Sequence, residues 1–123
     1  MASREPFQPV EIVEIPTPAG LVLRLRGEID LSSVDEAGRV LLDAGAALPP
    51  PALVVLDLTP VGFLSAVGLR ALLRFADRCA ERGVRTHLVS TSDGIVRRVL
   101  RVSDADERIP AFDTVEQALH AAP

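Results

Sequence analysis

The stretch DLTPVGFLSAVGLRALL, residues 57–73, leads from a hydrophobic strand through a short loop into a helix. Its single serine, Ser65, stands where the loop becomes the helix. A serine at this place can cap the unpaired backbone N–H groups of the helix, carry a regulatory phosphate or act as a nucleophile. We expect the capping role first, the phosphate second and the nucleophile last, because serine is a favoured N-cap residue.

Strand patterns alternate with helix patterns on both sides of this stretch. Hydrophobic runs predict five strands, at residues 10–15, 21–25, 52–58, 85–90 and 108–112. The run ALVVLDL at 52–58 is continuously apolar, which is typical of a strand covered on both faces. Because parallel neighbours need long crossovers, we expect an α/β fold with a mostly parallel central sheet of about five strands and about four helices.

Capping residues and helical spacing predict where the helices begin. The first helix begins after Ser32 or Ser33 and stops at the run ALPPP. Its apolar face consists of Val34, Ala37, Val40, Leu41 and Ala44. The third helix begins after Ser92 or Asp93, and a T-x-x-Q capping box at residues 114–117 opens the fourth.

The second helix, predicted at residues 67–82 with Gly83 as its C-cap, separates an apolar side from a charged one. The side expected to face the sheet consists of Leu69, Leu72, Leu73, Ala76 and Ala80. The other side carries Arg70, Arg74, Asp77, Arg78 and Glu81. Two interpretations of the charged side stay open: a solvated surface with local ion pairs, or a docking face for an acidic partner, since arginine makes planar bidentate contacts.

Length and charge limit the class of protein. With 123 residues, 48% of them hydrophobic, the chain fits one domain, which we place at residues 10–122 after a loose lead-in at 1–9. The net charge of −4 argues against nucleic-acid binding, which uses a basic surface. No apolar run approaches the ~20 residues that span a bilayer, so we expect a cytoplasmic protein without direct membrane insertion.

Residues that could carry catalysis or bind a metal do not fall into the required patterns. Ser65 lacks the G-x-S-x-G elbow, and His87 and His120 are expected to be structural or solvated histidines. No set of ligands has the spacing of a metal site, and no G-K-[ST] makes a phosphate loop. Cys79 is expected to be a small buried hydrophobe rather than a redox sensor. We therefore expect no enzymatic activity, cofactor or metal.

Four segments carry a resemblance to a known family. GEID at 27–30, VVLDLTPVGFLSAVGLRALL at 54–73, GVRTHLVS at 83–90 and VRRVLRVS at 96–103 resemble, in order and spacing, the STAS domain of bacterial anti-sigma factor antagonists. The resemblance extends over roughly residues 10–122. It implies a small α/β protein that binds an anti-sigma factor, commonly a serine kinase, and so regulates sigma-factor-dependent transcription.

The chain departs from the family pattern at the phosphorylation motif. In the family, the kinase phosphorylates the second of two Ser/Thr residues directly before Gly-Leu, a position that Val67 occupies here. Ala66 stands at the first serine, and Ser65 at the aspartate before it. Because valine has no hydroxyl, the resemblance implies a degenerate phosphorylation motif, with Ser65 as the candidate substitute.

The resemblance also implies a set of partner contacts, namely Asp30, Thr59, Ser65, Ala66, Val67 and Arg70. Two of them have structural alternatives, because Asp30 can serve as a turn or helix-entry residue and Thr59 can shape the turn after Asp57. Two other functions stay open: a scaffold subunit of a stress-signalling complex, or the soluble STAS partner of a lipid-transport ABC ATPase. The oligomeric state also stays open.

Overall fold

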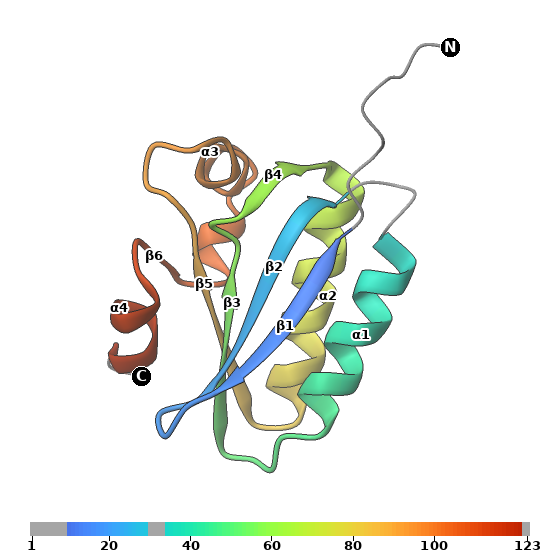
Figure 1. Cartoon of the computed structure of the whole chain (residues 1–123), viewed down its shortest axis with the longest axis vertical. Helices are drawn as coiled ribbons and strands as arrows, with labels where there is room; N and C mark the ends of the chain where they lie inside the picture. Colours follow the sequence, from blue (N-terminus) through green and yellow to red (C-terminus); the bar gives the residue numbers. More distant parts are fainter. Residues whose placement is uncertain (1–9, 30–33, 122–123) are drawn as a thin grey trace.

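A twisted central sheet organises the computed structural model, which describes residues 10–29 and 34–121 (Figure 1). The strands are β1 (Glu11–Pro16), β2 (Leu21–Ile29), β3 (Ala52–Asp57), β4 (Val61–Leu64), β5 (Val84–Val89) and β6 (Ala111–Phe112). The helices are α1 (Val34–Ala46), α2 (Ala66–Glu81), α3 (Ile95–Val102) and α4 (Val115–His120), with a 3-10 turn, η1, at Ala105–Glu107. The predicted residues 1–9 lead-in, Asp30, Ser32 and Ser33 lie outside the described residues.

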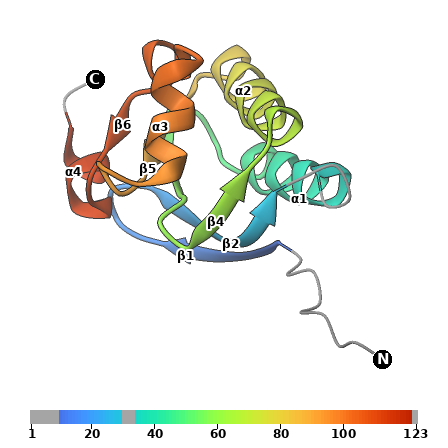
Figure 2. The same ribbon diagram turned by 90° about the horizontal axis from the view of Figure 1, so that it is seen from above.

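The strands are ordered β1-β2-β3-β5-β6, with β4 paired to β2. β1 runs antiparallel to β2, and the other pairs are parallel. The helices cover both faces: α1 and α2 lie side by side on one, and α4 lies against β3 and β5 on the other (Figure 2). The predicted α/β fold with a mostly parallel sheet is confirmed.

β3 shows why its sequence is continuously apolar. Val54 and Leu56 belong to the larger core, which the sheet forms with α1 and α2. Leu53 and Val55 point to the opposite face and belong to the smaller core under α4. Both faces of this strand are therefore buried, as predicted.

β4 occupies residues for which the sequence predicted only a loop. It pairs with the end of β2, which continues to Ile29 rather than stopping at residue 25. The pairing register shifts between Gly27 and Glu28, and Gly27 has a φ of 107°, so the bend that makes room for β4 requires a residue with a left-handed backbone. The four-residue segment VGFL is too short to show the alternation of apolar and polar residues that marks a strand, so its structure depends on pairing with β2.

The buried side of α2 differs in part from the prediction. Leu69 and Leu72 are buried and Leu73 is half-buried, but Ala80 is exposed, and Phe75 lies in the core instead. Cys79 is buried, as expected. The 3.6-residue period carries the buried side through Leu72, Phe75 and Cys79, past the position of Ala80. In α1, Val40 likewise lies at the exposed edge rather than in the core.

Two of the predicted helix caps need correction. α3 begins after Gly94, and no side chain caps it, whereas Ser92 or Asp93 was expected. The loop closes through a bond from Gly94 N–H to the Thr91 carbonyl, 3.0 Å, which moves the helix start beyond both residues. In α4, Thr114 caps as expected, but the Gln117 side chain bonds the N–H of Asp113, so the capping box is not reciprocal.

Candidate functional site

The carboxyl ends of β2 and β3 meet the start of α2 at one edge of the molecule, onto which Figure 2 looks. In open α/β sheets this edge is the usual place for ligand and partner sites. The predicted contact residues lie here: Thr59 on the turn after β3, Ser65 at the N-cap of α2, and Ala66, Val67 and Arg70 on its first two turns. The structure thus brings these five together at one edge.

Ser65 is the N-cap of α2, as predicted. Its hydroxyl oxygen accepts a hydrogen bond from Gly68 N–H at 3.1 Å and donates its proton to the Ile29 carbonyl at 3.0 Å. The Ser65 N–H donates to the same carbonyl at 3.0 Å. The hydroxyl is therefore engaged as both donor and acceptor, and it fastens the helix start to the end of β2.

Gly68 allows this close approach. A Cβ at this position would lie 2.6 Å from Ile29 Cγ2 and 2.8 Å from the Ile29 carbonyl oxygen, both far inside van der Waals contact. Glycine is thus required here by the packing of the helix on the strand end, and not by its own backbone angles. The glycine of the Gly-Leu pair at residues 68–69 is therefore explained by steric contact with Ile29.

The start of α2 presents two small side chains and, one turn later, an arginine to its surroundings. Ala66 and Arg70 are exposed, and Val67 is half-buried. Val67 and Arg70 line the upper end of a groove between α1 and α2. Arg70 makes no ion pair with the residues that the structure describes.

Asp57 holds the turn that leads to this surface. Its carboxylate is buried, lies 2.9 Å from Arg24 Nε and accepts hydrogen bonds from the N–H and the hydroxyl of Thr59, at 3.1 and 2.8 Å. The Thr59 hydroxyl points back into its own turn, which supports the structural alternative for this residue. Asp30 belongs to the undescribed residues, so its position relative to the site is not part of this geometry.

Sequence reasoning missed the exposed hydrophobic residues beside this turn. Phe63 on β4 is 47% exposed, and Ile95 and Val102 on α3 are 59% and 77% exposed. α3 packs against β4, so the elements that carry these exposed residues are neighbours (Figure 1). The sequence signal was a phenylalanine, Phe63, that belonged to no predicted helix or strand. Its exposure became evident only from the pairing of β4 with β2.

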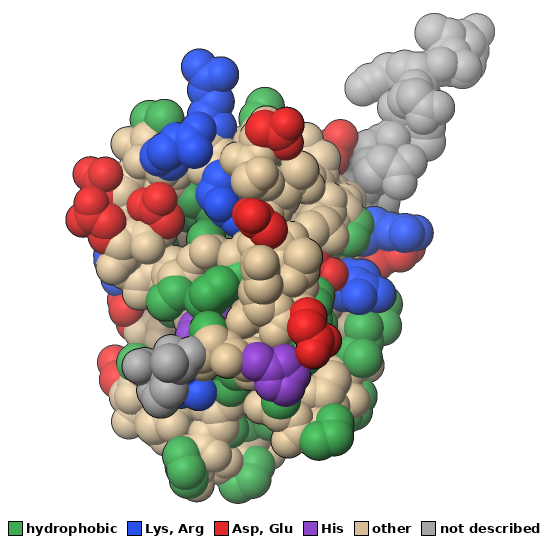
Figure 3. Space-filling view, turned by 90° about the vertical axis from the view of Figure 1, so that its left-hand side faces the viewer, with side chains coloured by type: hydrophobic (Ala, Val, Ile, Leu, Met, Phe, Trp, Pro, Cys, Tyr) green, Lys and Arg blue, Asp and Glu red, His purple; other side chains and the backbone are tan. Residues whose placement is uncertain are grey.

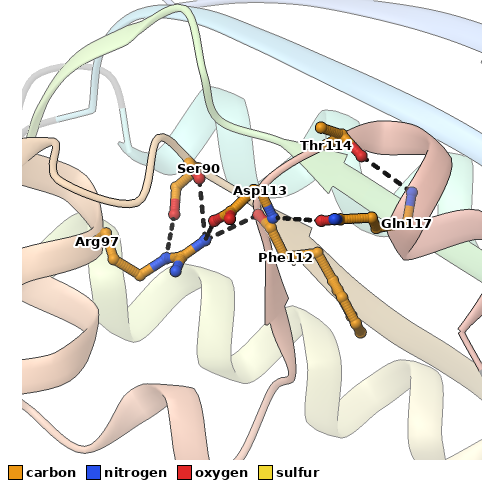
Figure 4. Close-up of polar contacts among 6 residues, drawn as sticks. All are labelled: Ser90, Arg97, Phe112, Asp113, Thr114 and Gln117. Atoms are coloured by element: carbon orange, nitrogen blue, oxygen red, sulfur yellow. Dashed lines mark hydrogen bonds and ion pairs between the residues drawn. The ribbon is translucent and has the colours of Figure 1, made fainter.

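The sequence also gave no sign of the polar clamp around Arg97 (Figure 4). Its guanidinium donates to the Ser90 hydroxyl at 2.7 Å, to the carbonyls of Ser90 and Phe112 at 2.9 and 2.8 Å, and to the Asp113 carboxylate at 3.1 Å. These bonds join α3 to the ends of β5 and β6 and to the start of α4. All of the acceptors are groups of this chain that lie at the ends of its strands and helices, so the clamp has a structural role.

On the side of the molecule that carries α4, acidic, basic and hydrophobic side chains are intermixed (Figure 3).

The remaining candidate groups have structural roles. His87 is buried, with Nδ1 2.8 Å from the Ala118 carbonyl, and His120 is exposed with Nε2 3.4 Å from Glu116, so both histidines are as expected. Cys79 is buried, and burial raises the pKa of its thiol above the ordinary value, against smaller lowering effects of a Thr86 hydrogen bond and of Arg82. Within residues 10–29 and 34–121, no three His, Cys, Asp or Glu side chains are placed to hold a metal ion, and no helix could cross a membrane.

Comparisons with known proteins find relatives of this chain in sequence and in fold. The family model described as STAS domain matches residues 9–118. The anti-sigma-F factor antagonist RsfA of Mycobacterium tuberculosis is 30% identical over 103 residues, which are 84% of this chain and 80% of RsfA. An anti-sigma factor antagonist from Mycobacterium paratuberculosis shares the fold, with a TM-score of 0.80 at 24% identity over 91% of this chain and 92% of that one. An anti-sigma-factor antagonist (STAS) domain protein from Planctomyces limnophilus has a TM-score of 0.72 at 27% identity over 89% of this chain and 95% of that one.

Proposed function

Since the chain belongs to the STAS domain family, we propose that it acts as an anti-sigma factor antagonist, which binds an anti-sigma factor and so leaves a sigma factor free for transcription. The printed role of its relative RsfA supports this, because RsfA is an anti-sigma-F factor antagonist. Proteins of this kind act by binding, and the chain is a binding regulator rather than an enzyme. We place it in the cytoplasm, where sigma factors act.

The observation that carries the proposal is the exposed first turn of α2. The first N–H groups of a helix have no partner within the helix, and here the small side chains of Ala66 and Val67 let another backbone come close to them. Arg70 follows one turn later as an exposed cation. Phe63 adds an exposed apolar contact beside this turn.

We propose further that the partner is of the serine-kinase type, but that this chain is not switched by phosphate at residue 67. Val67 and Ala66 have no hydroxyl. The Ser65 hydroxyl is engaged with Gly68 and Ile29, and a phosphate on it would replace the proton that it donates. Phosphoryl transfer needs close alignment of the acceptor, and an error of about 1 Å can cost on the order of a hundredfold in rate. The antagonist is therefore competent to bind without a prior dephosphorylation step.

A pair of substitutions at position 67 tests the surface. Val67→Asp places a negative charge where a phosphate would stand in the family, and Val67→Asn is its neutral control of the same shape. We expect the first to weaken binding to the histidine-kinase-like anti-sigma factor of the same genome by about tenfold more than the second. Isothermal titration calorimetry measures both affinities. Equal affinities would place the interface elsewhere, and capture of a transporter ATPase or a stress-signalling scaffold in place of an anti-sigma factor would contradict the proposed role.

Incubation with that kinase and ATP, followed by mass spectrometry, tests the absence of the switch. We expect little phosphate on Ser65 or Thr59. Near-stoichiometric phosphate on Ser65, together with release of the partner that Ser65→Ala prevents, would show that the switch has moved upstream.

A further inference from the structure

The seam between α1 and α2 is hollowed into a groove. One part encloses about 460 Å³ and the next about 300 Å³, and both are lined by Leu42, Asp43 and Phe75. Leu42, Val67 and Ala71 are half-buried, so the floor of the groove is apolar and partly open to solvent. The end of the groove at Val67 belongs to the surface proposed above, and the end at Arg78 lies beyond that surface.

One wall of the groove carries a line of three arginines from α2, Arg70, Arg74 and Arg78. Their spacing of four residues keeps them on one side of the helix, over about 12 Å. All three are exposed, and none is ion-paired with any residue of the described ranges. Asp77, their acidic neighbour, is held by Arg108 at 3.0 and 2.9 Å, so it does not compensate them.

The opposite wall, from α1, differs in charge. Asp35, Arg39 and Asp43 follow one another at the same spacing with alternating sign. Gly38 lies between them, and a Cβ built there meets nothing within 4 Å. The groove is therefore open at this point, and its excess of positive side chains lies on the α2 wall.

We infer that this groove binds an acidic amphipathic helix of a partner protein. An apolar stripe of such a helix covers the floor, and carboxylates spaced by four residues beside that stripe face Arg70, Arg74 and Arg78 in the same register. Three arginines in a line that form no ion pair with the described residues, on a chain whose net charge is −4, are the feature that selects an acidic occupant, although Glu81 lines the groove near Arg78. When the partner is the anti-sigma factor, the inference rests on the proposed function and extends its interface down the groove.

A second copy of this chain does not fit the same description. α1, α2 and α4 bury apolar residues in the chain's own core. α3 does expose Ile95 and Val102, but its outward face also carries Arg98 and Arg101, which would meet the arginines of the groove. Like charges at close range oppose such a contact. The occupant therefore comes from another protein.

A synthetic helix serves as the probe. We would use a fluorescein-labelled peptide of about 15 residues, long enough to form a helix, with leucines on one face and glutamates spaced by four beside them. The control peptide has glutamine at each glutamate. Fluorescence anisotropy is expected to show saturable binding of the glutamate peptide, about tenfold tighter than the control and weaker at high salt. Amide NMR shifts are expected along α1 and α2.

Two pairs of variants separate charge from shape. Arg74→Glu with Arg78→Glu is expected to weaken the glutamate peptide about tenfold, whereas Arg85→Glu with Arg101→Glu, the same charge change at exposed positions outside the groove, is not. Gly38→Leu is expected to block the groove, and Gly38→Ala to leave binding unchanged. Circular dichroism confirms the fold of each variant. Equal binding of both peptides, shifts confined to α3, or concentration-dependent dimerisation through α1 and α2 would overturn the inference.

The full-length anti-sigma factor distinguishes this inference from the proposed function. If Val67→Asp weakens its binding and Arg74→Glu with Arg78→Glu does not, the proposed function stands and the groove is not the site of the helix. If the anti-sigma factor does not bind at all, the proposed function fails, and the peptide titration still decides whether the groove accepts an acidic helix.

Discussion

Gly68 shows at the scale of a single residue how the site and the fold depend on each other. Gly68→Ala is expected to lower the free energy of unfolding by about 1–3 kcal/mol, because the new methyl group would meet Ile29 at 2.6 Å. Gly38→Ala is the matched control: it has open space and should raise stability by about 0.5–1 kcal/mol. Urea unfolding followed by circular dichroism measures both, since the chain has no Trp or Tyr. A similar loss in the two variants would contradict the steric argument.

Also at the residue scale, we expect Cys79 to make the free energy of unfolding depend on pH in the alkaline range. The chain has no lysine or tyrosine, so apart from the terminal amine Cys79 is the group that titrates at alkaline pH below the range of arginine. Burial raises the pKa of its thiol, so the folded state holds this proton more tightly than the unfolded state does. The resulting stabilisation is complete below the pKa of the unfolded thiol and is lost as pH rises towards the raised folded pKa. Unfolding free energies measured across this range should fall for the wild type and stay flat for Cys79→Ala.

Arg97 acts at the scale of elements, because it holds α3 and α4 to the ends of β5 and β6. Arg97→Ala is expected to cost about 2 kcal/mol or more, since it leaves carbonyl groups without their charge-assisted donor. Lysine should restore little of this, because it lacks the planar fork that reaches several acceptors at once. Arg98→Ala, an exposed neighbour with no ion pair in the described structure, should change stability by less than about 0.5 kcal/mol. Thermal unfolding of the three variants tests this prediction. Equal losses of stability for Arg97→Ala and Arg98→Ala would contradict the stabilising role of the clamp.

For the whole molecule, the two cores on opposite faces predict where hydrogen exchange is slowest. β3 and β5 are central and covered on both sides, so amides such as those of Leu56 and Leu88 should exchange only through global unfolding. β1 is an edge strand with exposed Val13, and its amides should exchange through local opening at lower cost. Exchange mapped by NMR tests this order. Protection of β1 equal to that of β3 would indicate that another surface covers the edge.

Periodicity in the sequence was sufficient for the α/β fold class and for the order of most elements. The apolar run at residues 52–58 required a strand covered on both faces, and its alternation with helical segments required parallel crossovers. The cap at Ser65 followed from residue type and position alone, because N-capping is local. The family, and the absence of a hydroxyl at Val67, were likewise readable from the sequence.

The sequence by itself determined the order and type of most elements, because hydrogen bonds within a helix and the burial period of a strand are encoded in neighbouring residues. Only the tertiary structure decided β4, the exposure of Phe63, the clamp of Arg97 and the groove beside Arg74. Each of these depends on which distant segments meet: β4 pairs with β2 where the register shifts at Gly27, and the groove is lined by residues of both α1 and α2. Contacts of that kind have no period along the chain, and so they leave no local pattern to read.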